Sequence, residues 1–421
     1  MTHSVLKEFF NKRQLGVKLG LETMHALAES VGNPQNKLNF IHIAGTNGKG
    51  STAVMLEAIL RYSGFKVGLF TSPHLMSFCE RIQIDRQPLS EKVLMRLYKG
   101  LQPILSEVER QSNCHSPTFF EITTALALLA FYEEKVDWVV WETGMGGRLD
   151  STNIVQPKLS VITPISFDHQ AWLGSTLEAI AHEKAGIIKP NTPIISAPQF
   201  EVCAQVISKQ ALEKKAPYFR IKEDKILLEN ENLEGQKFSY EKTSYFLNLL
   251  GEHQRQNAAT VLEIVYGLRR SGIKISEEAI KSGFKTVTWP ARFQILQRNP
   301  LVILDGAHNA AGIEVLVKNY HALCGETKTN LLFGVLSDKE FPSMILHLLP
   351  LIKKVVLIPL TSSRAVKPDV LASYFRDQGT EIEIFSNFKN AWCALKSESL
   401  LITGSLYLAG EVLSFFDGFH N

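Results

Sequence analysis

The sequence predicts an α/β protein built from two domains, each with a parallel sheet covered by helices. Two observations lead to this prediction. Short apolar runs typical of buried strands alternate with helical patterns along most of the chain. The alternation is interrupted at residues 217–245, and it restarts after Thr288-Trp289-Pro290. We therefore expect domains at residues 1–288 and 289–421, and a chain of 421 residues is long enough for both.

The first domain is expected to begin with helices in residues 1–39 and to continue with a strand that starts at Phe40. Further strands are predicted where apolar residues run together, at residues 66–71, 81–85, 136–141, 159–164 and 192–197. Helical patterns occupy residues 51–62, 91–109, 118–134 and 177–185, and another runs from the last of these strands to about residue 215. Ser90 is a candidate N-cap, as is either Ser175 or Thr176.

Residues 217–245 read differently, because polar alternation there predicts an antiparallel appendage to the first domain. Two helices, residues 253–270 and 277–287, complete that domain. The second domain is expected to be smaller and Rossmann-like, with no glycine–lysine turn of its own. Its predicted strands are residues 301–304, 330–335, 354–359, 381–385 and 400–403, with helices between them.

A glycine-rich turn, Gly45-Thr-Asn-Gly-Lys-Gly-Ser51, joins the Phe40 strand to a helix. Glycines let backbone N–H groups approach a phosphate, the helix N-terminus favours an anion, and Lys49 would reach the terminal phosphates. The turn departs from the standard P-loop pattern, because the first glycine position falls at Ile43 and Gly50 stands where a hydroxyl is expected. An ordinary strand–helix turn is the alternative. We predict phosphate binding and a P-loop-type ATPase domain.

Composition excludes several classes of function. A net charge of +3 is too small for the basic face of a nucleic-acid-binding protein, although it suits small anionic substrates. No apolar run approaches a membrane span of ~20 residues, and the first residues lack a signal-peptide core. The five cysteines are scattered without a C-x-x-C pair, which argues against a disulfide framework or a zinc site. We expect a cytoplasmic monomer with free thiols.

Polar residues collect at the carboxyl ends of the predicted strands, where open α/β sheets bind ligands. They are Ser72, His74, Glu142, Asp168, His169, Asp305 and His308. Glu142 follows a buried strand, as the acidic residue of a Walker-B element does, and Mg²⁺ prefers such oxygen ligands. The alternatives are a salt-bridging role for Glu142 and a structural role for His169. On spacing alone, Lys184 is a surface lysine beside Glu183, and Asn257 is an ordinary polar residue of a helix.

Together, several motifs resemble those of a known family. GTNGKGS, TSPHL, ER, FFE, ETGMGGRLDSTN, DH, EKAGIIK, WPARFQ and DGAHN occur in this order between Leu19 and Ser405. They are similar to the motifs of folylpolyglutamate synthase and of the bifunctional dihydrofolate synthase/folylpolyglutamate synthase. These enzymes belong to the Mur ligase superfamily of ATP-dependent amide-bond ligases, and the Gly50 departure from the P-loop is a feature of this family.

The resemblance implies a role for each matching residue. The positions that match ATP contacts are Thr46, Asn47, Gly48, Lys49, Gly50, Ser51, Asn257, Arg292 and Asp305. Ser72, Glu142 and His169 match ligands of Mg²⁺, and a monovalent cation such as K⁺ is a further candidate. Lys184 matches a lysine that is carbamylated in the superfamily, and His308 matches the histidine of a DxAHN element. With Lys49, these two are the implied catalytic residues. The positions that match substrate contacts are Lys18, Leu19, Gly20, Leu21, Thr118, Phe119, Phe120, Glu121, Leu149, Asp150 and Ser151.

The implied reaction is the ATP-dependent addition of L-glutamate to dihydropteroate, to tetrahydrofolate, or to both, through an acyl phosphate. The active site is expected in the cleft between the two domains. One alternative is a Mur-type ligase that adds an amino acid to a cell-wall precursor. A nucleotide-dependent switch is another, but it needs an N-K-x-D element after a strand. Asn36-Lys37-Leu38-Asn39 precedes the glycine turn and lacks the aspartate. The expected partners are therefore small molecules, and neither nucleic acid nor a membrane.

Overall fold

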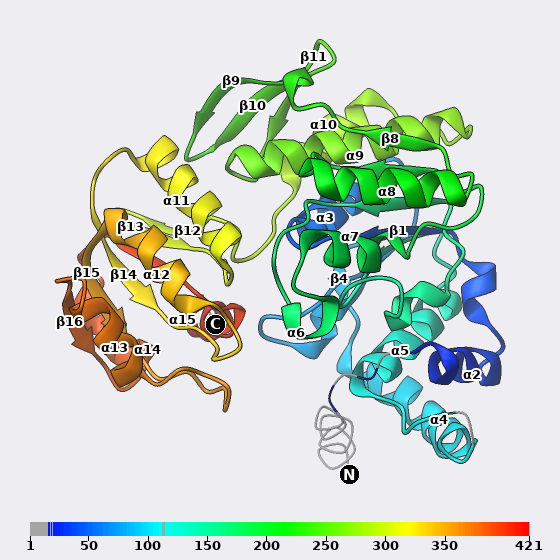
Figure 1. The fold of residues 1–421 in the computed structure, drawn as a ribbon, viewed down its shortest axis with the longest axis horizontal. Coiled ribbons are helices and arrows are strands. Elements are labelled where there is room, and N and C mark those ends of the chain that lie inside the picture. Colours follow the sequence, from blue (N-terminus) through cyan, green and yellow to red (C-terminus); the bar gives the residue numbers. More distant parts are fainter. Residues whose placement is uncertain (1–15, 17, 19, 112–113, 421) are drawn as a thin grey trace. The chain divides into compact units, whose positions relative to one another are not determined.

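The computed structural model describes residues 16, 18, 20–111 and 114–420. Contacts within the chain divide it into two compact units (Figure 1). Unit 1 comprises residues 1–226 and 256–287, and unit 2 comprises residues 227–255 and 288–421. This division groups residues 227–255 with the C-terminal part of the chain, although the sequence pattern attached them to the first domain. The domain limits at residues 288 and 289 stay a prediction.

Unit 1 is built on an eight-stranded sheet with the order β4-β3-β2-β5-β1-β6-β7-β8. The strands from β2 to β8 in this order run parallel, and β3 and β4 form an antiparallel edge. The strands are β1 (Phe40–Ala44), β2 (Val67–Phe70), β3 (Ile82–Ile84), β4 (Gln87–Pro88), β5 (Trp138–Glu142), β6 (Leu159–Ile162), β7 (Ile194–Ser196) and β8 (Tyr218–Arg220). Every residue of β1 and β5 is buried, as expected for a parallel sheet covered on both faces.

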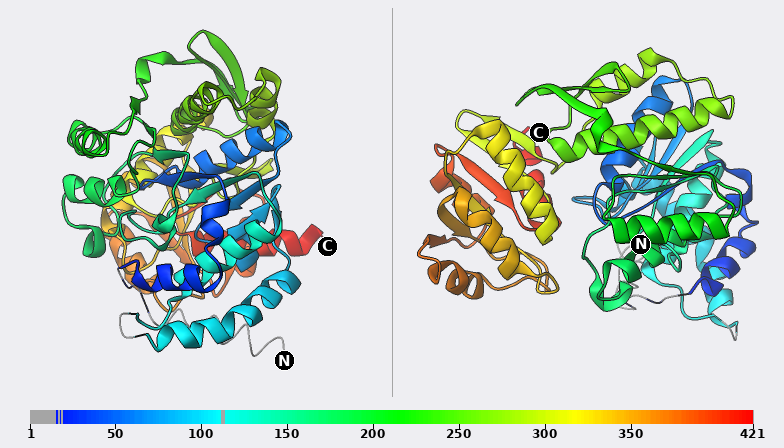
Figure 2. Two further views of the ribbon diagram at one scale, coloured as in Figure 1. Left: turned by 90° about the vertical axis from the view of Figure 1, so that its right-hand side faces the viewer. Right: turned by 45° about the horizontal axis from the view of Figure 1, so that its top comes forward.

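Helices cover both faces of this sheet (Figure 2). They are α2 (Glu22–Ser30), α3 (Lys49–Tyr62), α4 (Glu91–Glu109), α5 (Phe119–Glu133), α6 (Gln170–Leu173), α7 (Leu177–Ala185), α8 (Glu201–Glu213), α9 (Glu252–Arg270) and α10 (Glu277–Thr286). One core lies between α2, α4, α5 and the face of the sheet that carries Phe40 and Trp141. A second core beside it joins α7 and α8 to Ala44 and Ile162. Helices α3 and α10 pack together, and α9 lies against Leu159 and Ile195 of the sheet.

Unit 2 contains a six-stranded sheet with the order β12-β13-β17-β14-β15-β16 and a three-stranded sheet with the order β11-β10-β9. The first is parallel except for its edge strand β12. Its strands are β12 (Gln294–Arg298), β13 (Leu301–Leu304), β14 (Thr329–Phe333), β15 (Ile352–Leu357), β16 (Glu381–Ile384) and β17 (Leu400–Thr403). The small sheet consists of β9 (Ile226–Asn232), β10 (Gly235–Tyr240) and β11 (Thr243–Leu247).

The helices of unit 2 are α11 (Ala310–Cys324), α12 (Phe341–Leu348), α13 (Pro368–Arg376), α14 (Phe388–Leu395) and α15 (Leu406–His420). Its core gathers apolar residues of β13, β14, β15 and β17 with residues of α11, α12 and α13. Leu250, which precedes α9 in the sequence, also belongs to this core. Within the described residues, no helix combines the length and apolar character that are needed to cross a bilayer.

The structure confirms the α/β fold class and corrects several local predictions. Helix α3 begins at Lys49, two residues before the predicted start at Ser51, because Gly48 in the left-handed conformation serves as its N-cap. Strand β8 pairs in parallel with β7, so the antiparallel segment starts after it. Glu142 is the last residue of β5 rather than the residue after the strand. Strand β12, which pairs antiparallel with β13, was not predicted.

Candidate functional site

The turn between β1 and α3 depends on two glycines with positive φ angles. Gly45 has φ 150°, and a Cβ atom there would lie 1.8 Å from Oγ1 of Thr163. Gly48 has φ 84°, and a Cβ atom there would lie 2.5 Å from Oδ1 of Asn257 in α9. The predicted ATP contact Asn257 is thus buried directly against the turn. Only glycine fits these two positions, as a backbone that closely approaches a phosphate requires.

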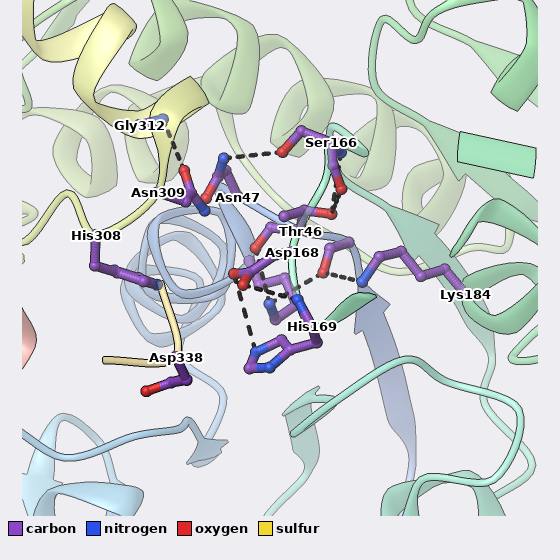
Figure 3. A network of polar contacts seen from close by, with 12 residues as sticks. Thr46, Asn47, Ser166, Asp168, His169, Lys184, His308, Asn309, Gly312 and Asp338 are labelled. Atoms are coloured by element: carbon purple, nitrogen blue, oxygen red, sulfur yellow. Dashed lines mark hydrogen bonds and ion pairs between the residues drawn. The ribbon is translucent and has the colours of Figure 1, made fainter. Parts of the chain in front are cut away.

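The segment after β6 holds the other side of this turn. The backbone N–H groups of Thr46 and Asn47 both donate to the carbonyl of Pro164, at 3.0 and 3.3 Å. Oγ1 of Thr46 donates to the carbonyl of Ser166 at 3.0 Å and accepts from its N–H at 3.1 Å. Asn47 donates to Oγ of Ser166 at 3.4 Å (Figure 3). Thr163 and Ser166 could not be recognised as neighbours of the turn from the sequence, because nothing in the local pattern shows that they face it.

Two lysines converge on the carbonyl oxygen of Gly45. Nζ of Lys49 donates to this oxygen at 3.0 Å and to the carbonyl of Thr46 at 3.1 Å. Nζ of Lys184, in α7, donates to the same Gly45 oxygen at 2.7 Å. Figure 3 shows the Lys184 side chain directed toward the turn. Lys184 is buried, so its interpretation from spacing alone as a surface lysine is wrong. The sequence could not show this contact because it spans 139 positions.

The environment of Lys184 favours the neutral amine. Burial, with a smaller contribution from the nearby charge of Lys49, lowers the pKa of this ammonium from 10.5 to about 7. Asp168 and Asp150 oppose the shift. A lysine amine that is neutral near pH 7 is a nucleophile, whereas a protonated one is not.

Ser72 and Glu142, two of the three predicted metal ligands, lie beside each other at the carboxyl ends of the parallel strands. Glu142 is buried, and its Oε2 accepts a hydrogen bond from the backbone N–H of Ser72 at 3.1 Å. His169 follows β6 with φ 52°, its N–H donates to Oδ1 of Asp168 at 2.9 Å, and its ring is exposed. In the described part of the chain, no three His, Cys, Asp or Glu side chains gather as a metal site. Mg²⁺ commonly uses one or two carboxylates together with waters and substrate phosphates, and Glu142 is a buried carboxylate of this kind.

Most of the predicted substrate residues fall into two groups, and each group contains one buried carboxylate, Glu121 or Asp150. Glu121 and Thr118 form a capping box at the start of α5, in which Oε2 of Glu121 accepts from N and Oγ1 of Thr118 at 2.8 and 2.7 Å. Burial raises the pKa of Glu121. Among the described residues its Oε1 has no hydrogen-bond partner, and Nε2 of His115 lies 3.6 Å away. Phe119 and Phe120 are half-buried beside it.

Asp150 organises the second group. Its Oδ2 accepts from the N–H of Met145 at 2.8 Å, and its Oδ1 accepts from N and Oγ1 of Thr152 at 3.1 and 2.5 Å. Burial raises the pKa of this carboxyl group as well. Oγ of Ser151 lies 3.0 Å from Oγ1 of Thr124 in α5, so a contact joins the two groups. Leu149 is half-buried.

Of the predicted contacts near the N-terminus, Lys18, Gly20 and Leu21 are described, and Leu19 lies outside the described residues. The charge of Lys18 lies close enough to Glu121 to lower its pKa, against the larger effect of burial. Leu21 precedes the first residue of α2, Glu22. This places the Lys18 charge near the capping box of α5.

In unit 2 the residues around Arg292 have an unusual backbone. Ala291 and Phe293, on either side of it, have φ angles of 55° and 44°. Such strain needs support from the surrounding structure, and Asp305 supplies it: Oδ2 accepts from the N–H of Phe293 at 2.7 Å and Oδ1 from the N–H of Ala307 at 2.8 Å. Burial raises the pKa of Asp305, while the charge of Arg292 opposes that shift. The sequence did not predict this supporting role.

The segment after β13 ends at the start of α11. Nδ1 of His308 lies 2.9 Å from the carbonyl of Gly306, so this nitrogen carries the proton and donates it. Asn309 is the N-cap of α11 and accepts from the N–H of Gly312 at 2.8 Å (Figure 3). The cap fixes the conformation of the residue next to His308.

Comparisons with known proteins match most of the chain to two domain families. Residues 43–265 match the Mur ligase middle domain, and residues 291–406 match the Mur ligase, glutamate ligase domain. The chain is 37% identical over 415 residues to the dihydrofolate synthase/folylpolyglutamate synthase of Bacillus subtilis, covering 95% of each chain. It is 31% identical over 418 residues to the Escherichia coli protein of the same name, covering 95% of this chain and 92% of that one.

Solved structures show the same fold. The Mycobacterium tuberculosis folylpolyglutamate synthase complexed with ADP and AMPPCP superposes with a TM-score of 0.89 at 31% identity, covering 98% of both chains. The E. coli FolC protein in complex with DHPP and ADP superposes with a TM-score of 0.84 at 30% identity, covering 99% of this chain and 98% of that one.

Proposed function

This chain belongs to the dihydrofolate synthase/folylpolyglutamate synthase family of Mur ligases, and we propose that it joins L-glutamate to a folate-type acceptor at the expense of ATP. The acceptor is dihydropteroate, tetrahydrofolate, or both. The names of the relatives support this proposal over ligation of a cell-wall precursor. The relatives bound to ADP or AMPPCP support the use of ATP. We further propose a monomer that works in the cytoplasm.

The observation that carries the proposal is the turn at Gly45, with Lys49 and Lys184 on one carbonyl oxygen. A carboxylate is a poor acceptor of an amine because its leaving group would be oxide. Transfer of the γ-phosphate to the acceptor's carboxylate supplies a better leaving group. The glutamate amine then attacks the acyl carbon, and phosphate departs from the tetrahedral intermediate. Most of the catalytic work is positioning and charge stabilisation, which a glycine turn, a helix N-terminus and Lys49 provide.

We assign the remaining nucleotide contacts to Thr46, Asn47, Gly48, Gly50, Ser51, Asn257, Arg292 and Asp305. The burial of Asn257 against Gly48 supports its assignment. The strained backbone on both sides of Arg292 supports a functional role for that side chain, because such strain is common at binding sites. His308 is proposed to contact the acyl phosphate or the phosphates of ADP.

Ser72, Glu142 and His169 are proposed to hold Mg²⁺, which when bound would neutralise phosphate charge. The buried Glu142 carboxylate at a strand end fits such an ion. Lys184 is proposed to be carbamylated, since the pKa near 7 makes its amine available to CO₂. In that step the amine nitrogen forms a bond to the carbon of CO₂ and loses a proton, which leaves an anionic carbamate.

The acceptor is proposed to bind between the Glu121 and Asp150 groups. Oε1 of Glu121 is a buried acceptor without a partner among the described residues, which suits a ligand that brings N–H donors. Leu149, Ser151 and the half-buried Phe119 and Phe120 would contact its apolar parts.

The test is ligation itself. The purified chain should incorporate labelled glutamate when it is given ATP, Mg²⁺ and either dihydropteroate or tetrahydrofolate, with each acceptor assayed separately. A Lys49→Ala variant should lose about 100-fold or more in turnover, because it removes the cation that is proposed to hold the transferring phosphate at the start of α3. Near-normal turnover in that variant, or incorporation with neither acceptor, would contradict the proposal.

A further inference from the structure

Unit 1 has a cavity at the amino ends of its parallel strands, and the Gly45 turn lies at their carboxyl ends. The cavity has a volume of about 510 Å³ and is lined by residues that precede or open five strands, among them Asn39, Trp138, Lys158, Pro193 and Pro217. Strand β1 (Phe40–Ala44) lies between Asn39 and the Gly45 turn, and its length separates the two ends by roughly 16 Å. The cavity therefore lies away from the Gly45 turn, and none of its residues is assigned a role in the proposed reaction.

The floor and the rim of the cavity differ in chemistry. Leu159, Ile195 and Leu268 form an apolar floor, and each is buried. Lys158 and Arg270 lie at the exposed rim, and no Asp or Glu is among the lining residues. An occupant would thus meet apolar surface inside and two positive charges at the opening. This is the usual arrangement of a small-molecule pocket, in which a few polar groups orient an otherwise apolar ligand.

The walls favour a flat ligand. The guanidinium carbon of Arg270 lies 4.9 Å from the centre of the Phe219 ring, in a cation–π contact. Phe219 is 38% exposed, so its ring is accessible. Two proline rings, Pro193 and Pro217, add flat apolar surface.

The cavity also depends on a glycine within a helix. A Cβ atom at Gly267 in α9 would lie 3.1 Å from Cδ1 of Leu159 and 3.7 Å from Nη2 of Arg270. Both of these residues line the cavity, so a larger side chain at Gly267 would enter it. Glycine costs an α-helix interior roughly 1 kcal/mol relative to alanine. Its presence here keeps the cavity open.

We propose that this cavity is a binding site for a small aromatic anion, with the ring on the apolar floor and the anionic group between Lys158 and Arg270. The proposal is independent of the ligation reaction, because the site is separate from the Gly45 turn. Binding is therefore measured directly and needs no turnover.

The probe is 2-naphthoate, titrated calorimetrically into the full chain in the presence of AMPPCP, with its neutral isostere 2-naphthamide for comparison. We expect one site with a dissociation constant below about 1 mM, which is reasonable for a ligand of this size. The amide should bind at least about fivefold more weakly, because it lacks the charge that the two cations attract.

Two variants locate the binding. Arg270→Gln removes the charge and the stacked guanidinium, and Gly267→Leu fills the cavity; each should weaken 2-naphthoate about tenfold or more. Lys274→Gln is the matched control, because it removes an exposed charge of the same sign that does not line this cavity. Absence of binding to the unaltered chain, equal binding of the amide, or unchanged affinity in both Arg270→Gln and Gly267→Leu would overturn the proposal.

Discussion

Lys184 combines a buried amine with a hydrogen bond to the carbonyl oxygen of Gly45. Its pKa is lowered from 10.5 to about 7. Between these values the folded protein binds fewer protons than the unfolded chain, so this residue makes unfolding less favourable as the pH rises from 7 to 10.5. Below pH 7 the amine is charged, and it is then unable to react with CO₂.

The first prediction follows from this titration. In buffer depleted of CO₂ the enzyme should lose activity, and bicarbonate should restore it, more completely at pH 8 than at pH 6. After addition of ¹³C-bicarbonate, a carbamate signal should appear in the ¹³C NMR spectrum and be absent from Lys184→Met. An active protein that contains Lys184 and gives no such signal in the same buffer would count against carbamylation.

The hydroxyl of Thr152 lies between two buried side chains, the imidazole of His42 and the carboxylate of Asp150. Burial lowers the pKa of His42 to about 3, so its ring is neutral. Nε2 of His42 lies 3.0 Å from Oγ1 of Thr152, and that hydroxyl donates to Oδ1 of Asp150 at 2.5 Å. The hydroxyl has only one proton, which it gives to Asp150. His42 must therefore carry its proton on Nε2 and donate it to Thr152.

Thr152→Val keeps the shape of the side chain and leaves both neighbours without this partner. We expect a loss of roughly 1–3 kcal/mol in the free energy of unfolding, the usual cost of one buried group without a partner, because Nε2 of His42 loses its acceptor while Oδ1 of Asp150 keeps the backbone N–H of residue 152. Chemical denaturation measures this loss. Thr152→Ser restores the hydroxyl and should retain most of the stability. No loss in Thr152→Val, or a loss in Thr152→Ser as large as that in Thr152→Val, would contradict the role of the hydroxyl.

At the scale of single elements, the proposed metal site depends on the carboxylate at the end of β5. Glu142 is the last residue of the strand, and its carboxylate already accepts from the N–H of Ser72. Glu142→Gln keeps an acceptor for this bond and removes the negative charge. Activity should fall, and the Mg²⁺ concentration that gives half-maximal activity should rise about tenfold or more. An unchanged Mg²⁺ titration with intact activity would show that Glu142 is a structural residue.

Elements whose limits depend on local hydrogen bonds were predictable from the sequence. Helix α4 begins after Ser90 as predicted, because Ser90 accepts from the N–H of Val93. Thr176, rather than Ser175, caps α7. These side chains satisfy N–H groups that an α-helix leaves without partners at its start, and this pattern is visible in the sequence.

Features that depend on distant contacts were not predictable. Lys184 resembles a surface residue within its own helix, and only the fold brings it beneath Gly45. The same holds for Ser166, which holds Thr46 across a separation of 120 positions. Asp305, which follows β13, accepts a hydrogen bond from Phe293, which precedes β12, so this contact also joins residues of different segments. A pattern of neighbouring residues carries no information about such pairs.

At the scale of the whole molecule, the two units interleave in sequence. The chain passes from unit 1 to unit 2 after Ile226, returns at Gln256, and leaves again after Val287. Helix α9 contains one of these crossings, because it begins at Glu252. A single cut in the chain therefore leaves part of one unit attached to the other.

The last prediction uses this arrangement. A fragment of residues 1–287 keeps the strands β9–β11 and Leu250 but loses the unit 2 core in which Leu250 is buried. The cores of unit 1 remain complete, so the fragment should show the circular dichroism of a folded α/β protein. It should also bind a hydrophobic dye strongly, and Leu250→Ser in the fragment should reduce this binding.

The same fragment lacks Arg292, Asp305 and His308, which we propose to act on the nucleotide and the acyl phosphate. It should therefore incorporate no glutamate from ATP, even at high acceptor concentration. The full chain with Asp305→Asn is the control for a merely destabilised fragment, because it keeps every core residue and removes the charge that Arg292 faces. This variant should stay folded and bind ATP more weakly. If residues 1–287 ligate glutamate at the rate of the full chain, unit 2 has no part in the reaction, and the assignments of Arg292, Asp305 and His308 are wrong.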